Sequence, residues 1–394
     1  MMQYKLCDNP WGKEELAAIQ AVMETGMYTM GEQVCQYEQE FAQKFGAPYA
    51  VMVSSGSTAN LLAIAALVYA NRLPRGSEII VPAVSWSTTY TPLEQYGMKL
   101  VFVDIDKDTL NISVDALKHA ITDKTRMIFL VNLLGNPNCF EEIFALCEGR
   151  NILILEDNCE SMGATYHGKQ LGTLGLMGTY STFYSHHMCT MEGGVVVTGD
   201  RELYEYMLAI RAHGWTRNLP EGSFIYQKKD NPFYESFNFI VPGYNLRPLE
   251  MEGAIGRVQL KKISGMIEQR RKNAEHFRQK VRNLPGIRLQ KEVEQSSWFG
   301  FSIVLEGELA QQRDEIVEKL RQANIEVRPI VAGNFTRNKV IEYMDYSIPA
   351  PLVNADDIHD HGFFVGNHSH DNSAEIDYFV QVMEEILERG KIHG

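Results

Sequence analysis

The chain has 394 residues, of which 45% are hydrophobic and 22% charged, and its formal net charge is −13. This composition predicts a compact protein with a large core, organised as one large and one smaller domain. The negative charge argues against nucleic acid or an anionic membrane as a partner. No apolar run approaches the length of a membrane span and no signal peptide is recognised at the start, so we expect a cytoplasmic protein.

The first part of the chain alternates helix and strand patterns. Apolar residues at helical spacing predict helices over 12–24 and about 32–45, and a short buried strand over 49–54. Ser55-Gly56-Ser57-Thr58 then opens an apolar helix over 59–70. A strand, a glycine turn and a helix N-terminus form a ready anion site, although an ordinary Ser/Thr helix cap is the alternative.

Further strands follow, and each of them is nearly all apolar. They are predicted over 78–82, 100–106, 126–132 and 151–156. Apolar strands that alternate with helices predict an α/β fold with a mostly parallel sheet covered on both faces. Asp157, at the end of the last of these strands, is either a ligand contact or a helix cap.

The segment 178–194 carries two adjacent histidines, His186 and His187, after a strand and before Glu192-Gly193-Gly194 and a new strand over 195–198. Polar groups at the end of a strand lie where α/β sheets bind ligands. A histidine there can act as acid and base near neutrality, since its ordinary pKa is about 6.5. Two ordinary loop histidines are the alternative.

The remaining predicted elements contain fewer candidate functional residues. A polar, aromatic and irregular stretch over 221–239 predicts a loop that extends over a binding site. The predicted helices and strands are a helix at about 200–212, a long amphipathic helix over 257–283, a strand over 298–305, a helix over 312–324, a strand within 325–334 and a helix over 374–389.

Cysteine spacing bears on metals and disulfides. The six cysteines contain no CxxC pair, and none lies beyond position 189. A disulfide framework or a zinc site is therefore not expected, and we predict no metal ion. Scattered reduced thiols suit the cytoplasm.

Four motifs together resemble one family over essentially the whole chain. They are Ser54–Asn60 (SSGSTAN), Glu156–Ser161 (EDNCES), the segment ending in Glu192-Gly193-Gly194, and Gly243–Glu250 (GYNLRPLE). They resemble the DegT/DnrJ/EryC1/StrS sugar aminotransferases, which are fold-type I pyridoxal phosphate (PLP) enzymes. The resemblance implies an aspartate aminotransferase-like fold, with a large PLP-binding domain over 1–255 and a linking helix with a small α+β domain over 256–394.

The resemblance also implies which residues bind the cofactor. Gly56 and Ser57 correspond to the phosphate cup, Trp86 to an aromatic that lies on the pyridine ring, and Asp157 to the partner of the pyridine nitrogen. Simple core packing is the alternative for Trp86. Glu160 stands where relatives often have glutamine and is expected near the ring hydroxyl or the substrate. The implied cofactor-binding residues are Gly56, Ser57, Trp86, Asp157, Glu160, Ser181 and Asn245.

One departure from the family pattern decides the reaction. With Ser181 and Glu192-Gly193-Gly194 aligned, the family's lysine position falls on His186, and the nearest lysines are Lys169 and Lys228. A lysine amine holds PLP covalently as a Schiff base, whereas imidazole cannot. We therefore expect PLP and pyridoxamine phosphate to be held non-covalently, with His186 as the catalytic acid and base.

The substrate side is implied by resemblance as well. The candidate substrate contacts are Ser185, His213, Phe237, Arg247 and Arg328. In the family, the segment around Asn245 reaches the cofactor phosphate of the neighbouring subunit, so a homodimer with shared sites is expected, to which Arg247 and Phe237 also contribute. A surface ion pair is the alternative for Arg247.

Histidine in place of lysine marks the 3-dehydratases of the family. One branch acts on a CDP-linked ketosugar with an iron–sulfur cluster, and its cysteines lie partly beyond the histidine segment, where this chain has none. The other branch acts without a cluster. It removes the C3 hydroxyl of GDP-4-keto-6-deoxy-D-mannose on the way to colitose, with L-glutamate as amino donor and with release of 2-oxoglutarate and ammonia. The loop residues Tyr184–His187 (YSHH) and Arg211–Pro220 (RAHGWTRNLP) resemble this second branch.

Three rival classes remain open on the sequence alone. A sugar-nucleotide aminotransferase shares the motifs but needs a lysine at 186. A non-catalytic protein on the same scaffold would bind cofactor without turning over glutamate. A nicotinamide-dependent Rossmann enzyme is disfavoured because no GxGxxG motif follows the first strand.

Overall fold

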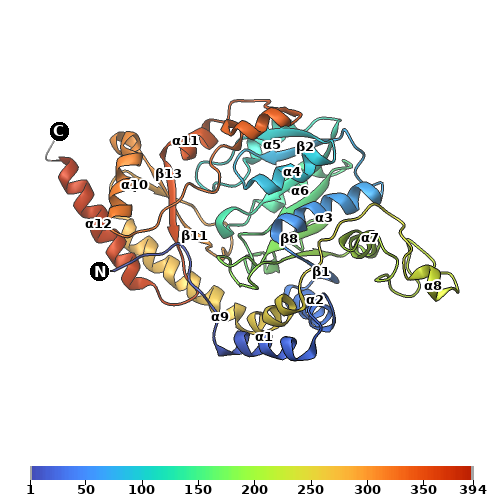
Figure 1. Ribbon diagram of the computed structural model, residues 1–394. Helices are drawn as coiled ribbons and strands as arrows, with labels where there is room; N and C mark the ends of the chain where they lie inside the picture. Colours follow the sequence, from blue (N-terminus) through green and yellow to red (C-terminus); the bar gives the residue numbers. More distant parts are fainter. Residues whose placement is uncertain (1, 392–394) are drawn as a thin grey trace.

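The structure, a computed structural model, describes residues 2–391 and contains a large domain built on a mixed sheet (Figure 1). Within the described chain this sheet has eight strands in the order β1-β9-β8-β5-β4-β2-β3-β12. Strand β9 runs antiparallel to both of its neighbours, β1 and β8, and the other neighbouring pairs are parallel. The strands are β1 (Tyr49–Val53), β2 (Glu78–Pro82), β3 (Lys99–Val103), β4 (Thr125–Val131), β5 (Leu153–Asp157), β8 (Met177–Ser181), β9 (Gly194–Thr198) and β12 (Tyr346–Ser347). The predicted mostly parallel α/β sheet is confirmed.

Helices cover both faces of the sheet, because successive side chains of each apolar strand point to opposite faces. In β2, Ile79 and Val81 pack in one core cluster with residues of α3, α4 and α7, whereas Ile80 packs with α5 and α6 in another. Helices α2 and α9 cover β1, β8 and β9. The helices concerned are α2 (Glu32–Phe45), α3 (Gly56–Tyr69), α4 (Ser87–Gln95), α5 (Val114–Ala120), α6 (Phe140–Cys147), α7 (Arg201–Arg211) and α9 (Glu250–Val281).

The long helix α9 leads from the large domain to a smaller one (Figure 1). The small domain has an antiparallel sheet in the order β10-β11-β13. Its core includes Phe277, Phe301 and Phe379, together with Tyr4 from the start of the chain. A domain boundary after residue 255 stays a prediction. The small-domain elements are β10 (Ile287–Leu289), β11 (Gly300–Leu305), α10 (Arg313–Gln322), α11 (Val353–His361), β13 (Gly362–Gly366) and α12 (Ser373–Lys391).

The remaining elements are short or peripheral. Helix α1 (Lys13–Thr25) packs on α9, and the short strands β6 (Thr165–Tyr166) and β7 (Lys169–Gln170) pair with each other. The stretch 221–239 is irregular apart from α8 (Pro232–Glu235), as expected. Across the described residues, no helix combines the length and the apolar character needed to cross a membrane.

Two predicted starts and one predicted strand differ from the structure for local reasons. Helix α9 starts at Glu250, not 257, because the Glu252 carboxylate accepts the Leu249 N–H at 2.8 Å and caps the helix. Strand β11 starts at Gly300 because Trp298 has a positive φ of 49°, which breaks the extended run. The predicted strand within 325–334 was wrong: this stretch makes only isolated bridges.

Candidate active site

A cavity of about 450 Å³ opens where several strands of the large sheet end. Its wall includes the turn after β1, the loop after β2, the ends of β4, β5 and β8, and the start of the loop that precedes β9. Ligands in α/β folds bind at this edge. The sequence-predicted residues that line the cavity are Gly56, Ser57, Trp86, Asp157, Glu160, Ser181, Ser185, His186 and Arg328.

The N-terminus of α3 forms the anion-binding part of the wall. The Ser55 hydroxyl caps the helix by accepting the Thr58 N–H at 3.1 Å. A Cβ on Gly56 would lie 2.6 Å from Cβ of Ser181 and 2.9 Å from Sγ of Cys159, so only glycine permits this close approach. Gly56 and Ser57 line the cavity here, so the unpaired N–H groups and the dipole of the first helical turn lie beside it.

A buried carboxylate lies deeper in the same cavity. Asp157 is 5% exposed, and its Oδ2 accepts hydrogen bonds from Asn60 Nδ2 at 2.9 Å and from Thr89 Oγ1 at 2.8 Å. Its Oδ1 accepts the Cys159 N–H at 3.1 Å. Asn60 is itself oriented by Thr179, whose hydroxyl donates to Asn60 Oδ1 at 2.6 Å. These donors fix the carboxylate in one orientation.

His186 lies in an aromatic setting beside this carboxylate-bearing wall. Its ring packs edge-on against Phe299 and Phe183, with centroid separations of 5.2 and 5.8 Å. Its Nδ1 is buried and has no hydrogen-bond partner. Burial, with a smaller contribution from the positive charge of Arg270, lowers the pKa of His186 to about 4. The imidazole is therefore neutral at pH 7 and can accept a proton.

The second histidine of the pair has a different environment. His187 is buried, and its Nε2 donates to the Ser297 carbonyl at 3.2 Å. It is absent from the cavity wall. Burial and the neighbouring Arg270 lower the pKa of His187 well below its ordinary value. Only His186 of the two is placed to meet a ligand.

The sequence did not reveal Arg270, a buried arginine that stabilises the loop packed against His186. It projects from α9, is 2% exposed, and donates to the carbonyl of Phe299 at 3.2 Å and to that of Asn367 at 2.6 Å. These bonds hold the backbone of Phe299, whose ring packs against His186. Asn60 and Thr89 were also not assigned from the sequence, although Asn60 lies within the motif Ser54–Asn60 and Thr89 lies three residues after Trp86.

Glu160 is a partly protonated carboxyl group at neutral pH. Its Oε2 accepts the Leu134 N–H at 3.0 Å. Burial raises the pKa of Glu160 to about 7, and the charge of Asp157 adds to the effect. Glu160 can therefore donate or accept a proton where it borders the cavity.

Replacing Glu160 with glutamine is expected to change how stability depends on pH. A carboxyl group with a raised folded pKa stabilises the fold below its unfolded pKa, near 4.5, and this contribution is lost as the pH rises through about 7. The full shift corresponds to about 3 kcal/mol, and we expect about 1 kcal/mol because the side chain borders the open cavity. Denaturant unfolding at pH 5 and 8 should show that the wild type loses stability relative to the glutamine variant. Equal losses in both proteins would contradict the raised pKa.

The other predicted residues lie outside the cavity wall and gather around Trp215. The His213 ring lies 4.7 Å from the Trp215 ring and the Phe237 ring 6.0 Å from it, while the Arg247 guanidinium lies 5.7 Å from the Trp215 centroid. Asn245 joins this cluster by accepting a hydrogen bond from Arg247 Nε at 2.9 Å. The structure thus brings His213, Phe237, Asn245 and Arg247 together, but outside the cavity wall that holds His186. Their roles stay predictions.

Comparison with known proteins identifies the class of protein. Residues 10–384 match the DegT/DnrJ/EryC1/StrS aminotransferase family, and the chain belongs to this family. It is 56% identical over 388 residues to the GDP-4-keto-6-deoxy-D-mannose 3-dehydratase of Yersinia pseudotuberculosis, covering 98% of this chain and 99% of that protein.

Solved structures agree with this relationship. The fold superposes with a TM-score of 0.96 on an E. coli GDP-4-keto-6-deoxy-D-mannose-3-dehydratase with bound hydrated PLP, at 55% identity, covering 97% of this chain and 100% of that one. A second structure of such a 3-dehydratase, with a trapped PLP-glutamate geminal diamine, superposes with a TM-score of 0.95 at the same identity and coverage.

Proposed function

We propose that this chain is a PLP-dependent dehydratase that removes the C3 hydroxyl of GDP-4-keto-6-deoxy-D-mannose, with L-glutamate as amino donor. The observation that carries the proposal is His186, a neutral imidazole in the cavity wall at the position where the family keeps a lysine. No lysine is found among the described residues that line the cavity. The near full-length identity to a 3-dehydratase supports the substrate.

The residues present fit the cofactor. The N-terminus of α3 lines the cavity with Ser55, Gly56 and Ser57, and its unpaired N–H groups suit a phosphate group. The carboxylate of Asp157 is fixed by three donors, which suits a protonated pyridine nitrogen. The Trp86 side chain is 58% exposed on the cavity wall, which leaves its ring available for stacking.

When bound, PLP supplies an electron-withdrawing ring and, in its amine form, the nitrogen that activates the C4 carbonyl of the sugar. Asp157 stabilises positive charge on the bound ring. His186 takes up a proton at its imidazole and, once charged, can donate a proton to the oxygen that leaves C3. Phe183 and Phe299 exclude water from one side of this imidazole. With no amine on residue 186, the cofactor is held non-covalently and transfer of the amino group to the sugar is disfavoured.

The two substrates are assigned to the remaining predicted residues. Arg328 lines the cavity and supplies a positive charge for the carboxylate of glutamate or the diphosphate of the sugar nucleotide, while Ser185 contributes a hydroxyl. We further propose a homodimer in which the Trp215 cluster completes the neighbouring subunit's site. The residues of that cluster with an assigned role are His213, Phe237, Asn245 and Arg247. The six free cysteines favour a cytoplasmic location, and no iron–sulfur cluster is proposed.

A single reaction mixture tests the proposal. The purified protein is mixed with PLP, L-glutamate and GDP-4-keto-6-deoxy-D-mannose, and the sugar nucleotide is identified by mass. We expect a product lighter by one oxygen atom, GDP-4-keto-3,6-dideoxy-D-mannose, with 2-oxoglutarate and ammonia released. A 4-amino sugar would instead identify an aminotransferase. No turnover here, with turnover in a second mixture that contains the CDP-linked ketosugar, would reassign the nucleotide.

A further inference from the structure

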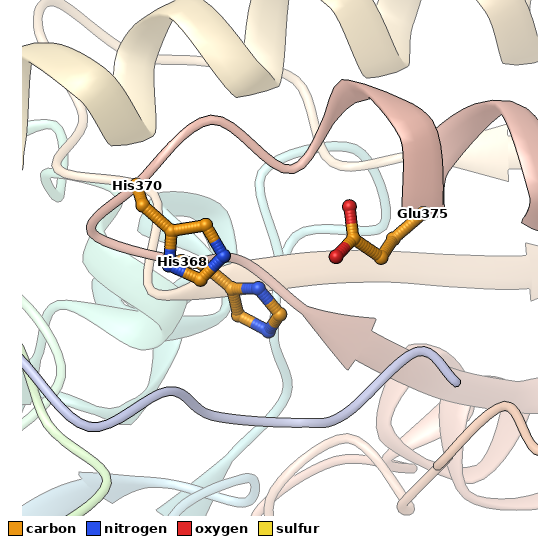
Figure 2. Close-up of side chains that lie close together, drawn as sticks. All are labelled: His368, His370 and Glu375. Carbon is orange, nitrogen blue, oxygen red and sulfur yellow. The ribbon is translucent and has the colours of Figure 1, made fainter. Parts of the chain in front are cut away.

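The small domain contains a group of metal-ligating side chains that none of the chemistry above uses. His368, His370 and Glu375 each offer one ligand atom within 4.8 Å of the others. His368 and His370 follow β13, and Glu375 lies in the first turn of α12. Figure 2 shows the three side chains pointing toward one another across a small gap. None of them lines the active-site cavity.

His368 presents an unpartnered lone pair to this gap. It is 4% exposed, and its Nε2 lies 2.9 Å from the Lys5 carbonyl oxygen. A carbonyl only accepts hydrogen bonds, so Nε2 carries the proton and Nδ1 of the neutral ring carries a lone pair. Nδ1 is buried and has no hydrogen-bond partner.

A carboxylate orients His370, so this ring also keeps one nitrogen free. Its Nδ1 lies 3.1 Å from Asp8 Oδ2, which also accepts the hydroxyl of Ser369 at 2.5 Å. A carboxylate accepts the proton of Nδ1, so Nε2 of the neutral ring carries the free lone pair. This nitrogen faces the Glu375 carboxylate in Figure 2. A histidine held by a carboxylate or a carbonyl at its other nitrogen is the usual arrangement around protein-bound metal ions.

We propose that His368 Nδ1, His370 Nε2 and the Glu375 carboxylate form a site for a divalent transition-metal ion such as Zn²⁺. Two imidazoles and a carboxylate suit zinc, and water from the exposed side of His370 fills the fourth position. Zinc–ligand bonds of about 2.0–2.2 Å require ligand separations of roughly 3.3–3.5 Å in a tetrahedral site. His370 and Glu375 are not buried and can turn inward by the remaining distance. The prediction of no metal rested on cysteine spacing, which does not bear on histidine and glutamate ligands.

The site joins the beginning of the chain to its last helix. Lys5 and Asp8 hold the outer nitrogens of the two histidines, and Glu375 belongs to α12. A bound ion therefore strengthens the attachment of the N-terminal segment to the small domain. Its role is that of a structural metal ion, not of a catalytic one.

Zinc titration of the full-length protein tests the proposal. Chelator-treated protein without a histidine tag is titrated with Zn²⁺ in a calorimeter, and its Tm is measured with and without the ion. We expect one saturable site per chain and a higher Tm with zinc. Glu375→Gln removes the ligand charge with little change of shape, and it should weaken binding at least tenfold. Asp8→Asn removes the carboxylate behind His370, and it should weaken binding about 10- to 100-fold.

A matched control is available in the same domain. His276 Nε2 pairs with Asp377 Oδ1 of α12 at 2.9 Å, so it is a histidine–carboxylate pair outside the proposed site. His276→Gln should leave zinc affinity and the zinc-dependent rise in Tm unchanged. Equal zinc binding by the wild type and the Glu375→Gln variant, or no saturable binding by the wild type at micromolar zinc, would overturn the site.

Discussion

Replacing His186 with lysine is expected to turn the protein yellow and to remove nearly all of its dehydration activity. A lysine amine at this position can bind PLP as a Schiff base, which the imidazole cannot. The loss of the neutral imidazole should lower kcat/KM for C3 deoxygenation on the order of 10²- to 10⁴-fold, the usual contribution of a general acid–base group. The absorption spectrum, borohydride reduction followed by protein mass, and the rate of product formation check these three outcomes.

Asparagine at the same position separates the two effects of the exchange. His186→Asn removes the imidazole without supplying an amine, so it should lose dehydration and leave the cofactor removable by dialysis. If borohydride fixes the cofactor to the native enzyme, a side chain other than residue 186 holds it and the proposed non-covalent mode fails. A lysine variant that binds PLP without any covalent attachment would show that residue 186 does not face the cofactor aldehyde.

The fold could be predicted because its main signals are local. The helix over 32–45 and the strand over 78–82 have the predicted bounds, since apolar periodicity and flanking glycine or proline mark them in the sequence. The start of α9 and the start of β11 could not be predicted. The first depends on a carboxylate cap at Glu252, and the second on the positive φ of Trp298, and neither leaves a periodic pattern.

The sequence predicted the active-site residues that lie within recognisable motifs, but not the residues that contact them from elsewhere in the chain. Asp157 and Gly56 lie at the ends of elements, where polar residues after an apolar run stand out. Their partners do not stand out, because Asn60 and Asp157 are 97 residues apart and meet only in the folded sheet. Arg270 gave no signal at all. An arginine on an amphipathic helix normally indicates a solvated face, and only the packing of α9 against the Phe299 loop buries it.

Replacing Asp157 with asparagine is expected to cause the second large loss of activity. The amide carries no negative charge, so it cannot keep a pyridine nitrogen protonated. In either orientation its NH₂ group faces a donor that needs an acceptor, Asn60 and Thr89 on one side or the Cys159 N–H on the other. Loss of one preorganised electrostatic partner costs on the order of 10²- to 10³-fold in rate, and we expect a fall of that size in kcat/KM together with a changed PLP absorption spectrum. Steady-state kinetics and spectral titration with PLP measure both.

Thr89→Val distinguishes the charge of Asp157 from its positioning. Valine removes one of the two donors to Oδ2 and keeps the carboxylate, with Asn60 Nδ2 and the Cys159 N–H still bound to it. One hydrogen bond contributes about 0.5–1.5 kcal/mol, so this variant should lose roughly tenfold or less in kcat/KM and keep the wild-type spectrum. Similar losses in Thr89→Val and Asp157→Asn would mean that the orientation of the wall matters and the negative charge does not, and the assignment of Asp157 to the ring nitrogen would then fail.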